Sequence, residues 1–217
     1  MSSILHKYFS EMDIDVSWYK KCSHEKITTS NSEFDDLRKI ISKCEQCDLY
    51  KTRNKTVFGS GPLNSKIMII GEAPGKDEDE QGEPFIGRAG KLLDAFLQSI
   101  NLSREKVFIT NTVKCRPPDN RNPSLDELNK CSSFLTNQIN AIKPKVLILL
   151  GKVAANNMLE NDSPISDLRQ KRFFIDKYDA PVIVFYHPAY ILRSPLKKSE
   201  VWEDLKYLNN ILKEHVC

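Results

Sequence analysis

Three polar side chains follow apolar runs that read as buried strands, and together they could perform chemistry. Glu72 lies in the glycine-rich turn 71–75, Asn111 follows a second run and His187 a third. A carboxylate can activate water, and an amide presents one acceptor and two donors in one plane. Each also has a structural explanation: a tight turn, a turn cap or a satisfied histidine. The turn lacks the third glycine of a dinucleotide fingerprint and the Gly-Lys-Ser/Thr of a P-loop, so the carboxylate is its unusual feature.

Cysteines form a second constellation, with gaps of 2, 67 and 15 residues between its members. The four candidate metal ligands are Cys44, Cys47, Cys115 and Cys131. Four thiolates without a nearby histidine fit either an all-cysteine zinc site or an iron–sulfur cluster, and the spacing leaves both open. The structural alternative is that Cys131, on the apolar face of a helix, is a core residue. Cys22 and Cys217 are expected to be free thiols.

Two further segments follow the glycine-rich turn. The acidic run 77–80 is typical of a solvated loop. Phe85 lies between a proline and a glycine, where a lid or stacking role is more natural than a core role.

The elements that must position these residues alternate along the chain. Apolar runs predict strands over 67–70, 107–110, 146–150 and 182–185. Amphipathic patterns predict helices over 88–100, 125–143, 152–159 and 200–214, the second starting with a capping box at Ser124. Unbroken apolar strands separated by helices indicate a three-layer α/β/α domain around a four-stranded parallel sheet. Segments that follow the strands should then meet at one end of the sheet.

Length and composition exclude several classes of protein. The chain has 217 residues, 40% hydrophobic residues and a net charge of +3, so it is neither disordered nor collagen-like. Its apolar runs are far too short to cross a membrane. Residues 1–15 lack the apolar segment of a secretory signal, so we expect a cytoplasmic protein with reduced thiols. We expect an N-terminal appendage over 1–32, a helix and a linker, and a catalytic domain with the metal site over 33–217.

Four motifs carry a family resemblance over about residues 36–215. They are Gly71-Glu-Ala-Pro-Gly75, Pro84-Phe-Ile-Gly87, Ile109-Thr-Asn-Thr-Val-Lys-Cys-Arg-Pro-Pro118 and His187-Pro-Ala-Tyr-Ile-Leu-Arg193. Together they resemble the family 4 uracil-DNA glycosylases, and the four cysteines match that family's iron–sulfur ligands in order. The resemblance implies the uracil-DNA glycosylase fold and a [4Fe-4S] cluster. It also implies hydrolysis of the N-glycosidic bond of uracil in single- or double-stranded DNA, in base-excision repair and without lyase activity.

The resemblance also implies roles for the three polar side chains. Asn111 would read the Watson–Crick edge of a flipped uracil, and His187 would hydrogen-bond its O2 atom. Glu72 would orient or activate water, or only stabilise positive charge on the sugar.

Further residues would complete the substrate contacts. Phe85 would stack on uracil, Ala73 would contribute backbone groups to the pocket, and Glu78 would border the C5 edge and disfavour thymine. The segment Tyr190, Ile191 and Leu192 would enter the DNA as an apolar wedge, and Arg193 would hold a flanking phosphate.

Two other functions fit the same residues. One is a catalytically inactive nucleic-acid-binding protein on the same fold, and the other is a zinc-stapled module for protein interaction. A [4Fe-4S]2+ core with four thiolates would lower the net charge to about +1. A DNA enzyme of that charge, expected to be a monomer, should concentrate positive side chains at Lys114, Arg116, Arg121 and 193–198.

Overall fold

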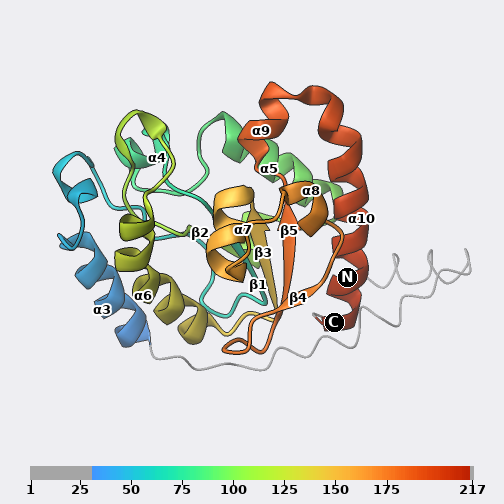
Figure 1. Ribbon diagram of the computed structural model, residues 1–217. Helices are drawn as coiled ribbons and strands as arrows, with labels where there is room; N and C mark the ends of the chain where they lie inside the picture. Colours follow the sequence, from blue (N-terminus) through green and yellow to red (C-terminus); the bar gives the residue numbers. More distant parts are fainter. Residues whose placement is uncertain (1–30, 216–217) are drawn as a thin grey trace, which may run out of the picture.

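The computed structural model describes residues 31–215, and five strands form its centre (Figure 1). They are β1 (Ile67–Gly71), β2 (Val107–Asn111), β3 (Val146–Leu150), β4 (Phe173–Phe174) and β5 (Pro181–Phe185). Their order in the sheet is β2-β1-β3-β5-β4. The four longer strands run parallel, as predicted, whereas β4 pairs antiparallel with β5 at the edge. Strand β4 was not predicted, because two residues are too few to show a periodicity.

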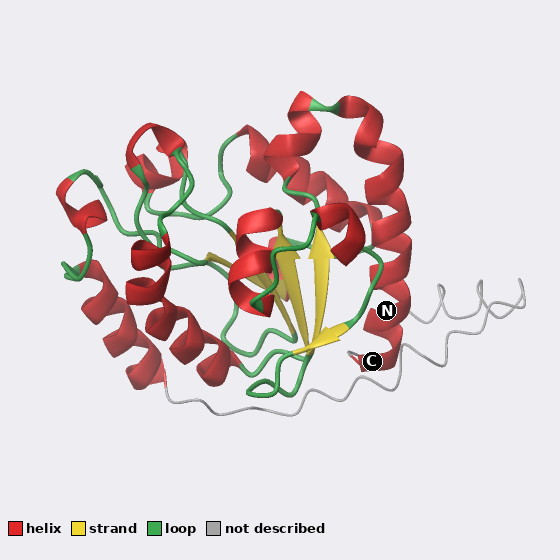
Figure 2. Cartoon of the chain, in the orientation of Figure 1, coloured by secondary structure: helices red, strands yellow, loops and turns green. Residues whose placement is uncertain are grey.

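Helices cover both faces of this sheet (Figure 2). The α-helices are α3 (Asn31–Ser42), α4 (Lys76–Gln81), α5 (Arg88–Ser99), α6 (Leu125–Ile142), α7 (Lys152–Leu159), α8 (Ile165–Leu168), α9 (Pro188–Arg193) and α10 (Lys198–His215). Short 3-10 helices occupy Asp48–Lys51, Arg104–Lys106, Pro118–Asn120 and Pro195–Lys197. The capping box predicted at the start of α6 is present.

Alternate side chains of each strand enter two separate cores. Met68 and Ile70 of β1 pack with residues of α3, α6 and α7, whereas Ile67 and Ile69 pack with residues of α5, α9 and α10. Because a strand's side chains point alternately to either face, a strand buried on both faces must be apolar throughout. The predicted α/β/α layering is confirmed.

The chain changes direction across the sheet at β1. It runs from β1 to β2 on one side and then returns to β3 on the other. Ligands of such sheets bind beyond the carboxyl ends of the strands near this reversal. Gly71 and Asn111, the last residues of β1 and β2, lie opposite each other there.

Two sequence expectations concern the chain ends. The predicted appendage lies outside the described residues except for positions 31 and 32, which begin α3, and the expected free thiols at 22 and 217 also lie outside them.

No helix within residues 31–215 is long and apolar enough to cross a bilayer.

Candidate active site

An open cavity of about 330 Å3 lies at the carboxyl ends of the parallel strands. Its wall contains every residue that was predicted to contact the base: Glu72, Ala73, Glu78, Phe85, Asn111 and His187. These residues lie at the end of β2 or after β1 and β5, so the predicted meeting of these segments at one end of the sheet is confirmed.

Asn111 presents an unpaired acceptor to this site. The residue is 1% exposed, and its Oδ1 is the one buried side-chain polar atom within residues 31–215 that has no hydrogen-bond partner. Leaving a buried acceptor unpaired costs about 1–3 kcal/mol, so such atoms are rare in folded proteins. The amide is therefore arranged for a ligand that brings its own donor.

Phe85 occupies a turn that is fixed in a strained conformation. Its φ of 53° is in the left-handed region, which bulky residues avoid. The Arg104 guanidinium donates to the carbonyl oxygens of Phe85 and Pro84, the latter at 3.0 Å, and pairs with Asp94 at 2.6 Å. A Cβ atom at Gly90 would lie 1.6 Å from the Phe85 oxygen, so only glycine fits there. Phe85 is buried, at 5% exposure, and packs in the core with residues of α5 and α10, which corrects the expectation that it would have no core role. It also lines the cavity.

Glu78 fastens the same turn from the other side. Its carboxylate accepts hydrogen bonds from the backbone N–H groups of Gly75 at 3.1 Å and of Ile86 and Gly87 at 3.0 Å each. It thus joins two loops of the cavity wall. Its predicted position beside the C5 edge of uracil stays a prediction.

The acidic run 77–80 is helical, which corrects the expectation of a solvated loop. Asp79 of α4 is 0% exposed and accepts hydrogen bonds from the backbone N–H of Asn54 at 2.9 Å and from its Nδ2 at 2.7 Å. The sequence expectation was wrong for Asp79 because its donors lie 25 residues earlier in the chain.

His187 is held in one tautomer. Its Nδ1 accepts the backbone N–H of Ala189 at 3.1 Å, so the proton of the neutral ring is on Nε2. Burial, together with the charge of Arg193, lowers the pKa of His187 to about 4, so the ring is neutral at pH 7. The ring lies 5.6 Å from that of Phe85, centroid to centroid. Gly151, directly after β3, leaves room for it, since a Cβ there would lie 2.9 Å from His187 Cβ.

Glu72 is a half-buried carboxylate. Within residues 31–215 it forms no side-chain hydrogen bond or ion pair, and burial raises its pKa. Its backbone is fixed, because the Thr112 hydroxyl donates to the Glu72 carbonyl oxygen at 2.5 Å. A carboxylate held at the cavity without a cation can act on water or on positive charge.

Helix α9 corrects part of the predicted DNA wedge. Ile191 is 0% exposed and packs in the core with α5 and α10, so it cannot enter DNA in this conformation. Tyr190 is half-buried, with its ring 5.1 Å from that of Tyr186. Leu192, at 36% exposure, and Arg193 face solvent, and Arg193 also lines the cavity.

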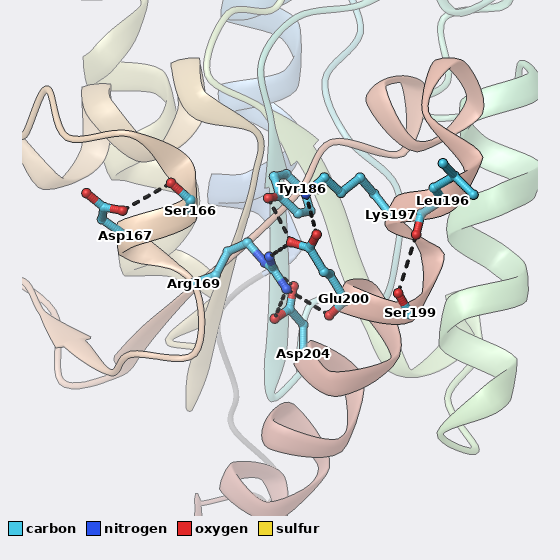
Figure 3. A network of polar contacts seen from close by, with 9 residues as sticks. All are labelled: Ser166, Asp167, Arg169, Tyr186, Leu196, Lys197, Ser199, Glu200 and Asp204. Carbon is cyan, nitrogen blue, oxygen red and sulfur yellow. Dashed lines mark hydrogen bonds and ion pairs between the residues drawn. The ribbon is translucent and has the colours of Figure 1, made fainter.

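A partly buried ionic network lies beside the strand end that precedes His187 (Figure 3). Arg169 contacts both carboxylates of α10 that face it, donating to Asp204 at 2.7 Å and to Glu200. Its guanidinium also lies 4.3 Å from the centre of the Tyr186 ring, and the Tyr186 hydroxyl donates to Glu200 at 3.0 Å. Tyr186 directly precedes His187, so this network fixes the backbone on which the histidine stands.

Three of the expected positive side chains do not face DNA freely. Lys197 pairs with Glu200. Lys114 is 1% exposed and lies in the core, because its ammonium group is bound by polar groups inside the protein. Arg121 lines the cavity but pairs with Glu127 at 2.7 Å. Arg193 is the exposed cation that remains at the cavity wall.

The four cysteines line a second, smaller cavity between α3, α6 and the end of β2: Cys44, Cys47, Cys115 and Cys131. Burial raises the pKa of the Cys131 thiol to about 11. Arg53 donates to Cys115 Sγ at 3.2 Å and to the Cys44 carbonyl oxygen at 2.6 Å, and a backbone N–H from Lys114 points to Cys131. Within residues 31–215, no three His, Cys, Asp or Glu side chains converge as ligands of a single metal ion. Four sulfurs beside cations and N–H donors nevertheless fit an anionic, thiolate-ligated group.

Arg53 and Arg104 were not predicted from the sequence. Arg53 stands six residues after Cys47, so its distance from a candidate ligand was the one available signal. Nothing in the sequence singled out Arg104, whose contacts with the Phe85 turn exist only in the folded chain.

Comparisons with known proteins identify the family of this chain. The family model described as the uracil DNA glycosylase superfamily matches residues 58–206. The chain is 42% identical to a type-4 uracil-DNA glycosylase of Archaeoglobus fulgidus over 82% of this chain and 92% of the relative. It is 37% identical to a type-4 uracil-DNA glycosylase of Thermotoga maritima over 83% and 97%, respectively. The chain therefore belongs to the uracil DNA glycosylase superfamily and, within it, to the type-4 uracil-DNA glycosylases.

Proposed function

We propose that the protein performs its family's reaction, hydrolysis of the N-glycosidic bond of uracil in DNA, with Asn111, His187 and Glu72 at the centre of its site. The products are free uracil and an abasic site, which base-excision repair then processes. The observation that carries the residue assignment is the unpaired Asn111 Oδ1, a buried acceptor in the cavity wall.

Asn111 selects the base by its hydrogen-bond pattern. Uracil offers an N3–H donor to Oδ1 and an O4 acceptor to the amide nitrogen. Cytosine reverses this pattern, so it would leave both buried groups of the amide mismatched. The fixed peptide of Asn111, paired with Gly71 in the sheet, supports such a reading.

His187 stabilises the departing base. Its Nε2–H would donate to uracil O2, where negative charge grows as the glycosidic bond breaks. The Ala189 N–H on Nδ1 supports this direction of donation. A donor placed where charge develops is worth roughly a few kcal/mol of barrier lowering.

Glu72 acts on the sugar side of the bond. Its carboxylate, without a cationic partner among the described residues, would orient the attacking water or stabilise the oxocarbenium-like sugar. Because the base departs largely on its own, Glu72 need not be a strong base.

The remaining wall residues position the uracil ring. Phe85 stacks on it, the backbone of Ala73 closes the pocket, and Glu78 borders the C5 edge while it holds the two loops together. Leu192 enters the DNA from the end of α9, beside Tyr190, and Arg193 binds a flanking phosphate. The substrate is single- or double-stranded DNA.

Cys44, Cys47, Cys115 and Cys131 would hold a [4Fe-4S] cluster. Such a cluster supplies a rigid, anionic cross-link between the segments that carry its ligands, and it can accept or release one electron. Arg53, which donates to Cys115 Sγ, would share its hydrogen bond with the bound group. Thiolate ligation requires a reducing compartment, so we place the enzyme in the cytoplasm. We also propose that it is a monomer.

One assay with matched substrates tests the proposal. Purified enzyme is incubated with single-stranded oligonucleotides that contain uracil or cytosine at the same position, and free base and iron are measured on one sample. We expect uracil release, no cytosine release and a brown protein with iron. Binding without release at high enzyme concentration would identify a nucleic-acid-binding protein instead, and a colourless zinc protein would overturn the cluster.

A further inference from the structure

Lys114 is a fully buried lysine whose three ammonium protons all have acceptors. Its Nζ lies 2.7 Å from each of Thr110 Oγ1, Asn111 O and Gln138 Oε1. Gln138 is itself fixed, because its Nε2 donates to the Phe58 carbonyl oxygen at 2.8 Å. The side chain therefore has a single defined place in the core.

No carboxylate accompanies this cation. Within residues 31–215 it forms no ion pair, and the acidic groups that act on it are the thiols of Cys131 and Cys115. Buried charges are usually paired, because removal of an ion from water costs several kcal/mol. The negative charge that would balance Lys114 is therefore the charge at the cysteine site.

Lys114 also lies between the two sites along the chain. Cys115 follows it directly, and its own backbone N–H points to Cys131. Its carbonyl oxygen accepts the N–H of Val57 at 2.8 Å, so the peptide is held as well as the side chain. One residue thus contacts the surroundings of two cysteines and the carbonyl of Asn111.

We propose that Lys114 is a positioning residue that couples the four-cysteine site to Asn111, so that occupancy of the uracil pocket and the state of the cluster influence each other. The inference rests on the proposed function, in which Asn111 reads uracil and the cysteines hold the cluster. Lys114 acts through the Asn111 peptide, whose carbonyl oxygen accepts its hydrogen bond.

The coupling follows from the geometry of a peptide group. A hydrogen bond on the Asn111 carbonyl oxygen fixes the rotation of that peptide and hence the direction in which the side chain leaves the strand. A hydrogen bond weakens steeply when its length or angle changes, so a small rotation would misalign Oδ1 with the N3–H of uracil. Coupling between two sites is reciprocal, and uracil bound at Asn111 must therefore alter the surroundings of the cysteines.

The experiment uses the cluster-loaded protein and two single-stranded oligonucleotides that resist hydrolysis. One carries 2′-fluoro-2′-deoxyuridine and the other 2′-fluoro-2′-deoxycytidine at the same position, so the two differ only in the edge that Asn111 reads. Affinity, visible circular dichroism and reduction potential of the cluster are measured with each. In the wild type we expect tighter binding of the uracil oligonucleotide and a cluster signature that differs between the two. Phosphate contacts cancel in this comparison.

Variants then separate coupling from stability. Lys114→Met should reduce the ratio of the two affinities by about 10-fold or more, the value of one charge-assisted hydrogen bond, and should abolish the difference in cluster signature. Lys114→Gln can still donate to the Asn111 carbonyl oxygen. It should retain part of the affinity ratio and part of the difference in cluster signature. Leu135→Ala, in the same core and outside the polar contacts of Lys114, should lower Tm and leave both unchanged.

Each of these results supports or overturns the proposed coupling. Equal cluster signatures with the two oligonucleotides in the wild type overturn the coupling even if no variant folds, and so does a Lys114→Met protein that keeps the full affinity ratio. If the wild type neither distinguishes the two oligonucleotides nor releases uracil, the proposed function itself fails. Uracil release with equal signatures would leave the proposed function intact and remove only the role of Lys114.

Discussion

The side-chain oxygen of Asn111 occupies the space in which a side chain at Gly71 would begin. A Cβ atom there would lie 2.4 Å from Asn111 Oδ1 and 2.5 Å from Phe85 Cζ. The two residues are partners in adjacent parallel strands, so neither backbone can withdraw. Because Gly71 has no side chain, the space beside it accommodates the Asn111 amide and the Phe85 ring.

Gly71→Ala should therefore damage the site more than the fold. The methyl group would displace the Asn111 amide and the Phe85 ring together, and we expect kcat/KM for uracil release to fall by about 100-fold, as for one lost base contact. Steady-state kinetics and thermal melting of the same sample measure both effects. A variant with full activity would contradict the assigned positions of both side chains.

Asn111→Ala should reduce uracil release strongly at little cost in stability. The substitution removes a buried acceptor that has no partner, which offsets the packing that is lost. We expect Tm to change by only a few degrees and kcat/KM to fall by about 100-fold. A large fall in Tm with normal catalysis would mean that the amide is structural.

Glu72→Gln should change both the pH dependence and the stability. Burial raises the pKa of Glu72 in the folded state, so its carboxylate form, and with it the rate of uracil release, should be lost as the pH falls through that raised value. Since the native state holds this proton more tightly than the unfolded state, the wild type loses stability as the pH rises through the same range. The Gln variant should be slower, show no such acid limb and melt higher at neutral pH. A pH–rate profile with melting curves tests all three, and an unchanged acid limb would assign it to another group.

Cys115→Ser should lower the iron content and Tm without removing a chemical participant. Cys115 is buried beside Arg53, and its loss would leave that guanidinium without the sulfur acceptor. Iron analysis and the visible absorption band test the assignment. Unchanged iron and Tm would exclude Cys115 as a ligand.

Leu192→Ala should weaken the reaction on double-stranded DNA more than on single-stranded DNA, because the wedge is needed only where a base must leave a stack. Phe174→Ala is the matched control: Phe174 is 64% exposed, but it pairs with Pro181 at the start of β5, at the opposite end of the strand from His187. Uracil release from both substrates is compared for the two variants. Equal effects on the two substrates would exclude a wedge at Leu192.

The sequence predicted what depends on local pattern. The apolar runs located the four parallel strands, and the segments that follow them located Glu72, Asn111 and His187 at one end of the sheet. It failed where the outcome depends on partners distant in the chain. Asp79 was expected in a solvated loop and Lys114 beside the DNA, whereas the fold places Asn54 next to Asp79 and Gln138 next to Lys114. Ile191 read as part of an exposed wedge, whereas packing against α5 and α10 buries it.

Asp79 also determines which parts of the domain can unfold locally. Its buried carboxylate joins the segment that follows the first two cysteines to α4, which carries Glu78 and thereby both loops of the cavity wall. Opening residues 44–55 alone would leave this carboxylate buried without its donors, and opening α4 alone would break the same hydrogen bonds. Residues 44–55 and α4 should thus open as one cooperative unit, with matching hydrogen-exchange protection, and a chain shortened to remove the cysteine segment would lose the uracil pocket with it.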